Sequence, residues 1–355
     1  MSVAARDERR PQTVSAVIAT YTMDRWDDLC AAVASLQSQT HPVRETVVVV
    51  DHNPALLERA RRELPNVTVV SNAGKRGASS TRNSGVAVAH GEILAFVDDD
   101  AAASPAWLAR LMPHFGDPRV LGVGSRVTPI WEKCRPSWFP PEFDWTVGAS
   151  YKGLPETAVP VRNVWTNSML IKRDVFDAVA GFRSDFGKIG SRSQPEDVDL
   201  CLRITLAHGG GIWLYEPAAI MGHRVPKQRT VFSYFLVRCF HEGWGKAGLA
   251  DLHGVKQSTQ AEWRYTTRAL PRGIVTGLRD ACKGRLSGLF RAATIVIGFT
   301  VTTVGFLAYR AARLMPQAER GSGAEGMPSV AGELALQSVA EELPLAHVQE
   351  TIGMD

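Results

Sequence analysis

Residues 92–101 read EILAFVDDDA, and this stretch decides the fold class of the chain. The apolar run 93–97 is short and follows a glycine, which is typical of a buried β-strand. It ends at three adjacent carboxylates, Asp98, Asp99 and Asp100. Because side chains alternate along an extended strand, Asp98 and Asp100 are expected to point the same way. Such a pair at the carboxyl end of a strand suits a hard divalent cation shared with phosphate groups, and an acidic surface turn is the alternative interpretation.

The overall composition excludes several classes of protein. The chain has 355 residues, enough for one large domain or two modest ones with a buried core. Its net charge of +4 is too weak to indicate a nucleic-acid partner, and we find no zinc-knuckle spacing or basic–aromatic repeat. Five scattered cysteines favour a reduced, cytoplasmic catalytic part without disulfides or structural zinc. Residues 1–13 are polar and carry no apolar signal region, so we expect a disordered N-terminus.

Strands and helices alternate ahead of the acidic stretch. Strands are expected at 14–20, 47–50 and 67–70, and helices at 24–36 and 54–64, with Asp24 and Pro54 at the two helix starts. This spacing predicts an α/β fold with a doubly wound, mostly parallel sheet and helices on both faces.

Polar residues between these elements are candidates for contact with a nucleotide. Asp51 lies just past the second strand, where it could accept hydrogen bonds from a ribose or a uracil, or cap the helix opened by Pro54. The glycine- and base-rich segment 72–85 leads into a helix, and its Arg82 and Asn83 are the best candidates to meet a bound ligand. The segment matches neither the Walker nor the dinucleotide fingerprint, so solvated turn residues are the alternative.

A long loop interrupts the pattern after a strand expected at 120–127. Residues 129–160 are rich in proline and contain Trp131, Trp138 and Trp145. A loop of this length inside a compact domain is typically functional. Its aromatic side chains would either contact a sugar or lipid, or fill a small core of the loop itself, and both interpretations stay open.

The alternation resumes with a strand at 164–171 and a helix at 173–180. The following segment, 185–194, contains two glycines and is expected to act as a lid over a bound phosphate, with Lys188 and Arg192 as candidate contacts.

A second acidic site and a histidine follow. Glu196 and Asp197 occupy the first turn of a helix opened by a proline, where acids are ordinary partners of the helix dipole. Spacing alone therefore does not make Asp197 catalytic. Two short strands are expected at 212–215 and 219–221, with His223 directly after the second. A lone histidine is more often structural, but here it could complete a metal site begun by the aspartates.

The C-terminal part changes character. We divide the chain into a catalytic domain at 14–250, a basic helical segment at 251–313 and a disordered tail at 314–355. Within the basic segment, 292–309 holds 18 residues without charge, about 27 Å of helix against a hydrocarbon thickness of ~30 Å. This helix spans a cell membrane with the catalytic part in the cytoplasm, lies in the membrane interface, or packs against a partner.

Together, these motifs resemble family 2 glycosyltransferases with a GT-A fold. The signatures run in family order from about Val14 to Gly222: SAVIATYTMDR (15–25), VVVVDHNP (47–54), GASSTRNSGVAVAHGEILAFVDDDA (77–101), NSMLIKRDVFDAVAGF (167–182) and PEDVDLCLR (195–203). More narrowly, VVDHNP, RPSWFPPEFDW and GHRVP are similar to segments of prokaryotic enzymes that resemble glucosyl-dolichyl phosphate glucuronosyltransferase.

The resemblance implies an inverting transfer from a nucleotide-sugar, expected to be a UDP-sugar, to a glycan or a polyprenyl- or dolichyl-phosphate-linked sugar, with Mn²⁺ or Mg²⁺ as cofactor. It implies Asp197 as the base, with Glu196 beside it, and Asp100 as the metal ligand, with His223 as a further contact. The implied donor-binding residues are Thr20, Asp51, Arg82, Asn83, Asp98 and Asp99. The chain departs from many relatives at His52-Asn53 and at Pro195, which leaves base recognition and the approach of Asp197 open.

At a helix start, an ionised Asp197 is expected to have a depressed pKa and to be a weak base, so that proton transfer accompanies attack. Two other interpretations are a nucleotidyltransferase, which would release pyrophosphate, and a membrane-attached nucleotide-sugar-binding scaffold without activity.

Overall fold

The computed structural model describes residues 12–184, 195–254 and 262–314. The expected lid with Lys188 and Arg192, and almost all of the two terminal segments expected to be disordered, lie outside these residues.

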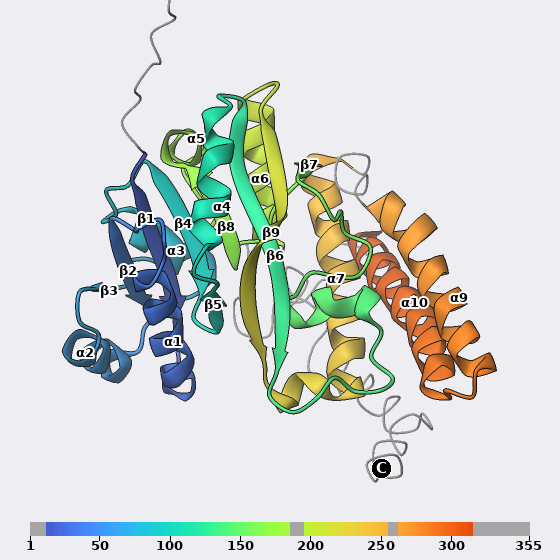
Figure 1. Cartoon of the computed structure of the whole chain (residues 1–355). Coiled ribbons are helices and arrows are strands. Elements are labelled where there is room, and N and C mark those ends of the chain that lie inside the picture. Colours follow the sequence, from blue (N-terminus) through green and yellow to red (C-terminus); the bar gives the residue numbers. More distant parts are fainter. Residues whose placement is uncertain (1–11, 185–194, 255–261, 315–355) are drawn as a thin grey trace, which may run out of the picture.

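A mixed nine-stranded sheet forms the centre of the molecule (Figure 1), in the order β3-β2-β1-β4-β8-β6-β9-β5 with β7 also pairing with β9. Strands β1 to β4 are parallel, β8 runs antiparallel to β4 and β6, and β9 is parallel to β6. The predicted mixed, mostly parallel sheet is confirmed. The strands are β1 Val14–Thr20, β2 Glu45–Val50, β3 Thr68–Ser71, β4 Ile93–Asp98, β5 Ala101–Ala103, β6 Val120–Trp131, β7 Val159–Val161, β8 Ser168–Lys172 and β9 Ile212–Val225.

Helices cover both faces of the sheet, because its buried strands present apolar side chains alternately to either side. Ile18 and Val48 join a core with Leu29 of α1, whereas Val17 and Phe96 join a second core with α3, α5 and α6. The helices are α1 Trp26–Gln37, α2 Pro54–Glu63, α3 Ala78–Val86, α4 Trp107–Leu111, α5 Arg173–Asp177, α6 Glu196–Ala207, α7 Phe232–His253, α9 Leu270–Cys282 and α10 Ser287–Leu314, with a 3-10 helix η3 Pro141–Val147 and a π-helix η5 Tyr265–Ala269.

The predicted helix start at Pro54 is confirmed, whereas the one at Asp24 is wrong. Helix α1 begins at Trp26, and Asp24 lies in a short 3-10 turn that is capped by the side chain of Thr22. Helix α2 is capped by Asn53, whose side chain accepts a hydrogen bond from the Leu56 amide at 3.1 Å. Asp51 is therefore free of the capping role.

The strands predicted at 212–215 and 219–221 form one strand, β9. Its pairing with β6 jumps from Ser125–Glu216 to Arg126–Ile220, so that Pro217 falls in a bulge. Because proline cannot donate a ladder hydrogen bond, it is accommodated where the pairing is already interrupted.

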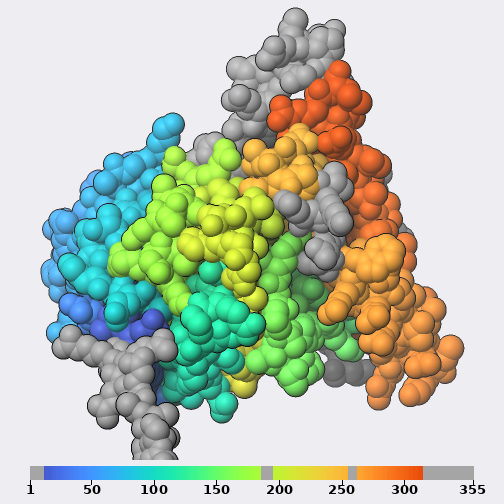
Figure 2. Space-filling view, turned by 90° about the horizontal axis from the view of Figure 1, so that it is seen from above, coloured from blue at the N-terminus to red at the C-terminus, as the bar shows by residue number. Residues whose placement is uncertain are grey.

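Helices α7, α9 and α10 form a layer beyond β6 and β9 (Figure 1), and in Figure 2 α9 and α10 make up the end of the molecule opposite β1 to β3. Helix α10 crosses α7 so closely that a Cβ atom on Gly243 would collide with the carbonyl oxygen of Thr302. Among the described residues, α10 is long and apolar enough to cross a membrane by length and composition, and 28% of its apolar window is buried.

The tryptophans of the long loop separate into different environments. Trp138 is 2% exposed and packs against Phe232 and Phe235 of α7, with ring centroids 5.0 and 5.8 Å away. It therefore fills the core between the loop and the helical layer. Trp145 lines the large cavity described below.

Candidate active site

A cavity of about 2430 Å³ opens at the carboxyl ends of β1, β2 and β4 and extends to α7, α9 and α10. Sites for one small ligand usually measure ~300–1,000 Å³. The cavity therefore has room for two substrates side by side. It also lies at the edge of an open α/β sheet where ligands commonly bind.

The register between β5 and β9 brings a histidine to the acidic turn. Asp98 ends β4, Asp99 and Asp100 form the turn that follows, and Ala101 of β5 pairs with His223 of β9. As a result, Nε2 of His223 lies 3.1 Å from Oδ1 of Asp100. Ligand atoms of Asp98, Asp100 and His223 all lie within 4.8 Å of one another.

Two arginines and a hydroxyl hold the acidic turn. Nη1 of Arg25 lies 2.7 Å from Oδ1 of Asp99 and 3.2 Å from Oδ2 of Asp100. Arg229 approaches the same Asp100 oxygen at 3.5 Å. Thr20 at the end of β1 donates its hydroxyl hydrogen to Oδ2 of Asp99 at 2.8 Å. Cations therefore offset much of the repulsion among the three carboxylates.

The same surroundings separate the acidities of the two buried aspartates. Burial raises the pKa of Asp99 to about 6, against the opposing charge of Arg25. Burial acts on Asp100 as well, but the interaction with His223 and the charges of Arg25 and Arg229 outweigh it and hold the pKa of Asp100 below its usual range. Asp100 is therefore the carboxylate that stays ionised in the turn.

The group formed by Asp98, Asp100 and His223 fits a divalent cation. Two carboxylate oxygens and an imidazole nitrogen are ligands that a divalent cation such as Mn²⁺ accepts. Within the described residues, Nδ1 of His223 is buried and has no hydrogen-bond partner. Gly148, with a φ of +81°, leaves room for the imidazole, because a Cβ there would lie 2.9 Å from Cε1 of His223.

Arg82 of α3 connects the two acidic sites. Its side chain is 7% exposed, with Nη2 at 2.9 Å from Oδ1 of Asp98 and Nη1 at 3.1 Å from Oε1 of Glu196. Both ends of the guanidinium are thus engaged by protein carboxylates. The arginine that we expected to contact the donor directly lies between the metal-binding group and the start of α6.

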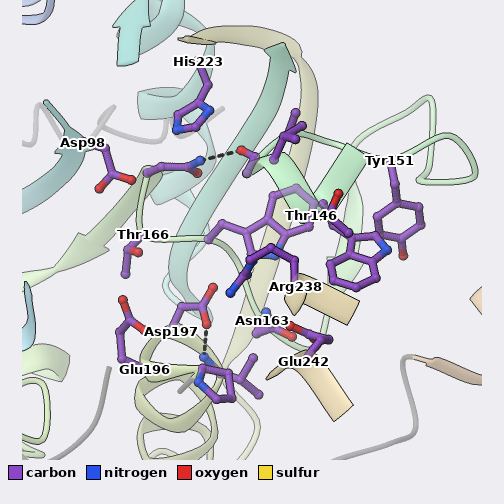
Figure 3. Close-up of a pocket in the computed structure, with 18 of the residues that line it drawn as sticks. Asp98, Thr146, Tyr151, Asn163, Thr166, Glu196, Asp197, His223, Arg238 and Glu242 are labelled. Atoms are coloured by element: carbon purple, nitrogen blue, oxygen red, sulfur yellow. Dashed lines mark hydrogen bonds between the residues drawn. The ribbon is translucent and has the colours of Figure 1, made fainter. Parts of the chain in front are cut away.

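Asp197 faces the same cavity from the first turn of α6 (Figure 3). Its Oδ1 accepts a hydrogen bond from the Val198 amide at 2.8 Å. Burial raises its pKa to about 7, and the nearby carboxylates of Glu196 and Glu242 add to the rise. The predicted depressed pKa was wrong, because these effects outweigh the helix dipole. Asp197 is therefore suited to take up a proton near neutral pH.

Asp51 and Asn83, both expected to bind the donor, have different placements. Asp51 lines the cavity and holds the glycine-rich segment, with Asn72 Nδ2 donating to its Oδ1 at 2.8 Å and the Gly77 amide to its Oδ2 at 2.9 Å. These bonds and one from His52 outweigh burial and lower the pKa of Asp51.

Asn83 does not appear among the described residues that line the cavity. Its side chain donates to the Phe182 carbonyl at 2.7 Å and accepts from the Phe182 amide at 3.0 Å. The prediction that Asn83 contacts the donor gains no support from this placement.

The comparisons with known proteins agree with this geometry. Residues 15–180 match the family model described as Glycosyl transferase family 2. The chain is 33% identical over 238 residues to glucosyl-dolichyl phosphate glucuronosyltransferase of Haloferax volcanii, an alignment that covers 66% of this chain and 76% of that protein. The chain belongs to glycosyl transferase family 2. This family 2 glycosyltransferase is also 26% identical over 253 residues to succinoglycan biosynthesis protein ExoM of Rhizobium meliloti, covering 66% and 75% of the two chains.

A solved structure supports the fold assignment. The mannosyltransferase PcManGT from Pyrobaculum calidifontis, in complex with GDP-Man and Mn²⁺, aligns with a TM-score of 0.55 at 17% identity, over 84% of this chain and 88% of that one. The predicted GT-A fold and glycosyltransferase activity are confirmed.

Several residues of this family 2 glycosyltransferase that line the cavity carried no sequence signal. Arg25 lies within the quoted motif 15–25, but its pairing with Asp99 and Asp100 depends on tertiary contacts. Glu242 of α7 lies near Asp197 although 45 positions separate them in the sequence. In the view of Figure 3, Glu242 and Tyr151 lie on the side of Asp197 away from Asp98. The charge around Asp197 therefore comes from α7 as well as from α6.

Proposed function

We propose that this family 2 glycosyltransferase inverts the anomeric centre as it transfers a sugar from a nucleotide-sugar donor, with UDP-sugars as the expected donors, to a hydroxyl of a polyprenyl-phosphate-linked sugar. The observation that carries the proposal is that the Asp98–Asp100 turn and the Glu196–Asp197 pair line one cavity and are connected through Arg82. Two acidic sites on either side of one sugar are what a single displacement requires: one for the leaving group and one for the incoming hydroxyl.

The half of the cavity that binds the donor, here called the donor half, would lie at the carboxyl ends of β1, β2 and β4. A divalent cation held by Asp98, Asp100 and His223 would neutralise the diphosphate leaving group without proton transfer. Asp51 is proposed to meet the ribose or base, since it lines the cavity at the end of β2. Thr20 and Asp99 are bonded to each other and would fix the turn that carries the other two aspartates.

The acceptor half would use the start of α6. Asp197 takes the proton of the attacking hydroxyl, and a pKa of about 7 gives it useful basicity at neutral pH. Glu196 is proposed to act with it: its ion pair with Arg82 fixes the first turn, and its charge helps to raise the pKa of Asp197. A single displacement places the new bond on the opposite face of the sugar, which gives inversion.

The lipid-linked acceptor is proposed from two observations. The Haloferax volcanii relative carries a name that specifies a dolichyl-phosphate-linked sugar. Helix α10 is apolar, mostly unburied and borders the cavity. We propose residues 14–250 as a cytoplasmic catalytic domain and 251–313 as the segment that associates with the cell membrane, although a soluble glycan acceptor remains the alternative.

The experiment is a donor-hydrolysis and transfer screen with UDP-, GDP- and TDP-sugars in the presence of Mn²⁺ or Mg²⁺. Asp197→Asn should lose turnover and keep nucleotide binding, whereas Asp100→Ala should lose metal-dependent nucleotide binding. Asp174→Asn, an exposed acid in the first turn of α5, serves as the matched control and should behave as the unaltered enzyme. Retained turnover in Asp197→Asn, or products with retained anomeric configuration, would refute the assigned mechanism.

A further inference from the structure

Three arginines line the cavity at the end remote from the acidic turn. Arg264 directly precedes η5, Arg268 lies within η5 and Arg272 lies in α9, so that they follow one another at four-residue steps, and all three are exposed. We call these three residues the arginine row. Residues three or four apart share one face of a helix, so their charges reinforce one another.

Among the described residues, the arginine row has no ion-pair partner, in contrast to the cations deeper in the cavity. Arg162 lies 3.1 Å from Glu262, and Lys246 lies 2.9 Å from Glu262 and 3.1 Å from Glu242. Within residues 12–184, 195–254 and 262–314, no carboxylate forms an ion pair with Arg264, Arg268 or Arg272. In the part of the chain that the structure describes, the remote end of the cavity therefore presents three arginines without ion-pair partners.

Two further acids line the cavity: Glu156, which forms an ion pair with Arg126, and Glu142 of η3. The second is 4% exposed and packs against α9, where a Cβ on Gly273 would lie 2.7 Å from its Cδ atom. Burial raises the pKa of this carboxyl.

An uncharged wall faces the same part of the cavity. Phe299, Thr302, Thr303 and Phe306 of α10 line it, and we call these four residues the α10 wall. They lie in the stretch 292–309, which contains no charged side chain. Phe299 is 47% exposed, although it is a large apolar side chain. Positive charge beside unburied apolar surface is the arrangement expected for an amphiphile with an anionic head.

We propose that the arginine row binds the phosphate of the lipid-linked acceptor, while the first isoprene units of its lipid leave the cavity along the α10 wall. The inference rests on the proposed function and adds the subsite that recognises the acceptor's anionic part. A guanidinium forms two parallel charge-assisted hydrogen bonds with a phosphate, so a row of three holds a phosphate or diphosphate firmly. The acceptor sugar would then extend inward, past Glu242, to Asp197.

Phospholipid head groups of the bilayer carry the same phosphate chemistry. We assign the row to the acceptor because its residues line the cavity that also holds Asp197. Arg279 supplies the contrast: it is a basic, exposed residue of the same helix that is not among the cavity-lining residues described. A general attraction to the membrane surface would involve Arg279 as much as the arginine row.

The test measures binding of farnesyl phosphate and of farnesol to the full-length enzyme by calorimetry, with saturating UDP and Mn²⁺ to occupy the donor half. The unaltered enzyme should bind farnesyl phosphate at least tenfold more tightly than farnesol. The triple variant Arg264→Gln, Arg268→Gln, Arg272→Gln should lose this preference. Arg279→Gln is the matched control and should retain it. Donor hydrolysis by all three proteins reports that each is folded and that the donor half is intact.

Vesicles that contain an anionic phospholipid provide the second arm. If the triple variant loses vesicle binding but keeps its preference for farnesyl phosphate, the arginine row contacts the bilayer and the inference is overturned. Equal binding of farnesyl phosphate and farnesol by the unaltered enzyme overturns it as well. Failure of the unaltered enzyme to hydrolyse any nucleotide-sugar would instead count against the proposed function, so the two failures are distinguishable.

Discussion

Replacing the proposed base by a neutral isostere should make the protein more stable, and the gain should grow as the pH rises from about 4 to about 7. The pKa of Asp197 rises from 3.8 to about 7, chiefly through burial and then through Glu196. Because one pKa unit corresponds to 1.36 kcal/mol, the ionised form costs the folded state about 4 kcal/mol. Asp197 is only partly buried and lines the cavity, so we expect about 2–4 kcal/mol to be measurable.

The sign follows from proton uptake. Between pH 3.8 and about 7, the unfolded chain has an ionised Asp197 while the folded chain keeps the proton. Folding therefore takes up a proton in this window, and the contribution of this group to stability falls as the pH rises. Below pH 3.8 both states are protonated and the cost disappears; above pH 7 it is present in full.

Asp197→Asn removes this titration and keeps an oxygen that can accept the hydrogen bond from the Val198 amide. Urea unfolding followed by circular dichroism, in EDTA, should give equal free energies of unfolding for the two proteins at about pH 4. At about pH 8, the variant should be more stable by about 2–4 kcal/mol.

The control is Asp174→Asn, because Oδ1 of Asp174 accepts the equivalent bond from the Val175 amide at 2.8 Å in the first turn of α5, but Asp174 is exposed. Its variant should stay within about 0.5 kcal/mol of the unaltered protein at both pH values. An equal gain for Asp197→Asn at pH 4 and pH 8, or a loss at pH 8, would refute the argument.

Two further predictions concern the packing around the cavity. Arg82→Met keeps the length of a side chain that is 7% exposed but removes the charge between Asp98 and Glu196. It should lower the free energy of unfolding, measured by urea titration, by about 3 kcal/mol. An unchanged unfolding midpoint would contradict this prediction. Gly243→Ala should destabilise by about 1–3 kcal/mol because its Cβ would collide with Thr302 of α10. Thermal melts measure both glycine variants. Gly248→Ala in the same helix should be neutral or stabilising, since its Cβ would lie 3.6 Å from the Tyr309 ring.

The central strands could be predicted from the sequence because they are buried on both faces. Such strands are continuous apolar runs, and their carboxyl ends are marked by the first polar residue. β1 occupies the predicted 14–20, and β4 extends only one residue beyond the predicted 93–97, to Asp98. β9 was harder to predict because Pro217 interrupts its pattern. The two predicted strands become one only through pairing with β6, in which a bulge accommodates the proline.

The site was predicted less completely, since its charges are set by distant residues. The acidic turn and the Glu196–Asp197 pair are visible as local motifs. The direction in which the pKa of Asp197 shifts cannot be predicted locally. A rule for helix termini does not include burial by the rest of the fold or the charge of Glu242. The pairing of Arg229 with Asp100 also requires the β5–β9 register, which no local pattern specifies.

The two acidic sites differ in how their charges are compensated, and this difference supports their separate roles. His223, Arg25 and Arg229 keep Asp100 ionised, as a ligand for a cation must be. Asp197 lies among carboxylates, and the attraction of Arg82 is the smallest of the effects on its pKa. One group is thus held as a permanent anion, while the other can gain and lose a proton near pH 7. The surroundings thus separate the pKa values of the two carboxylate sites. This separation allows one site to stabilise charge and the other to transfer a proton in the same cavity. Placing a cationic side chain beside Asp197 would compensate its charge as that of Asp100 is compensated. It should therefore abolish turnover, even though every carboxylate is retained.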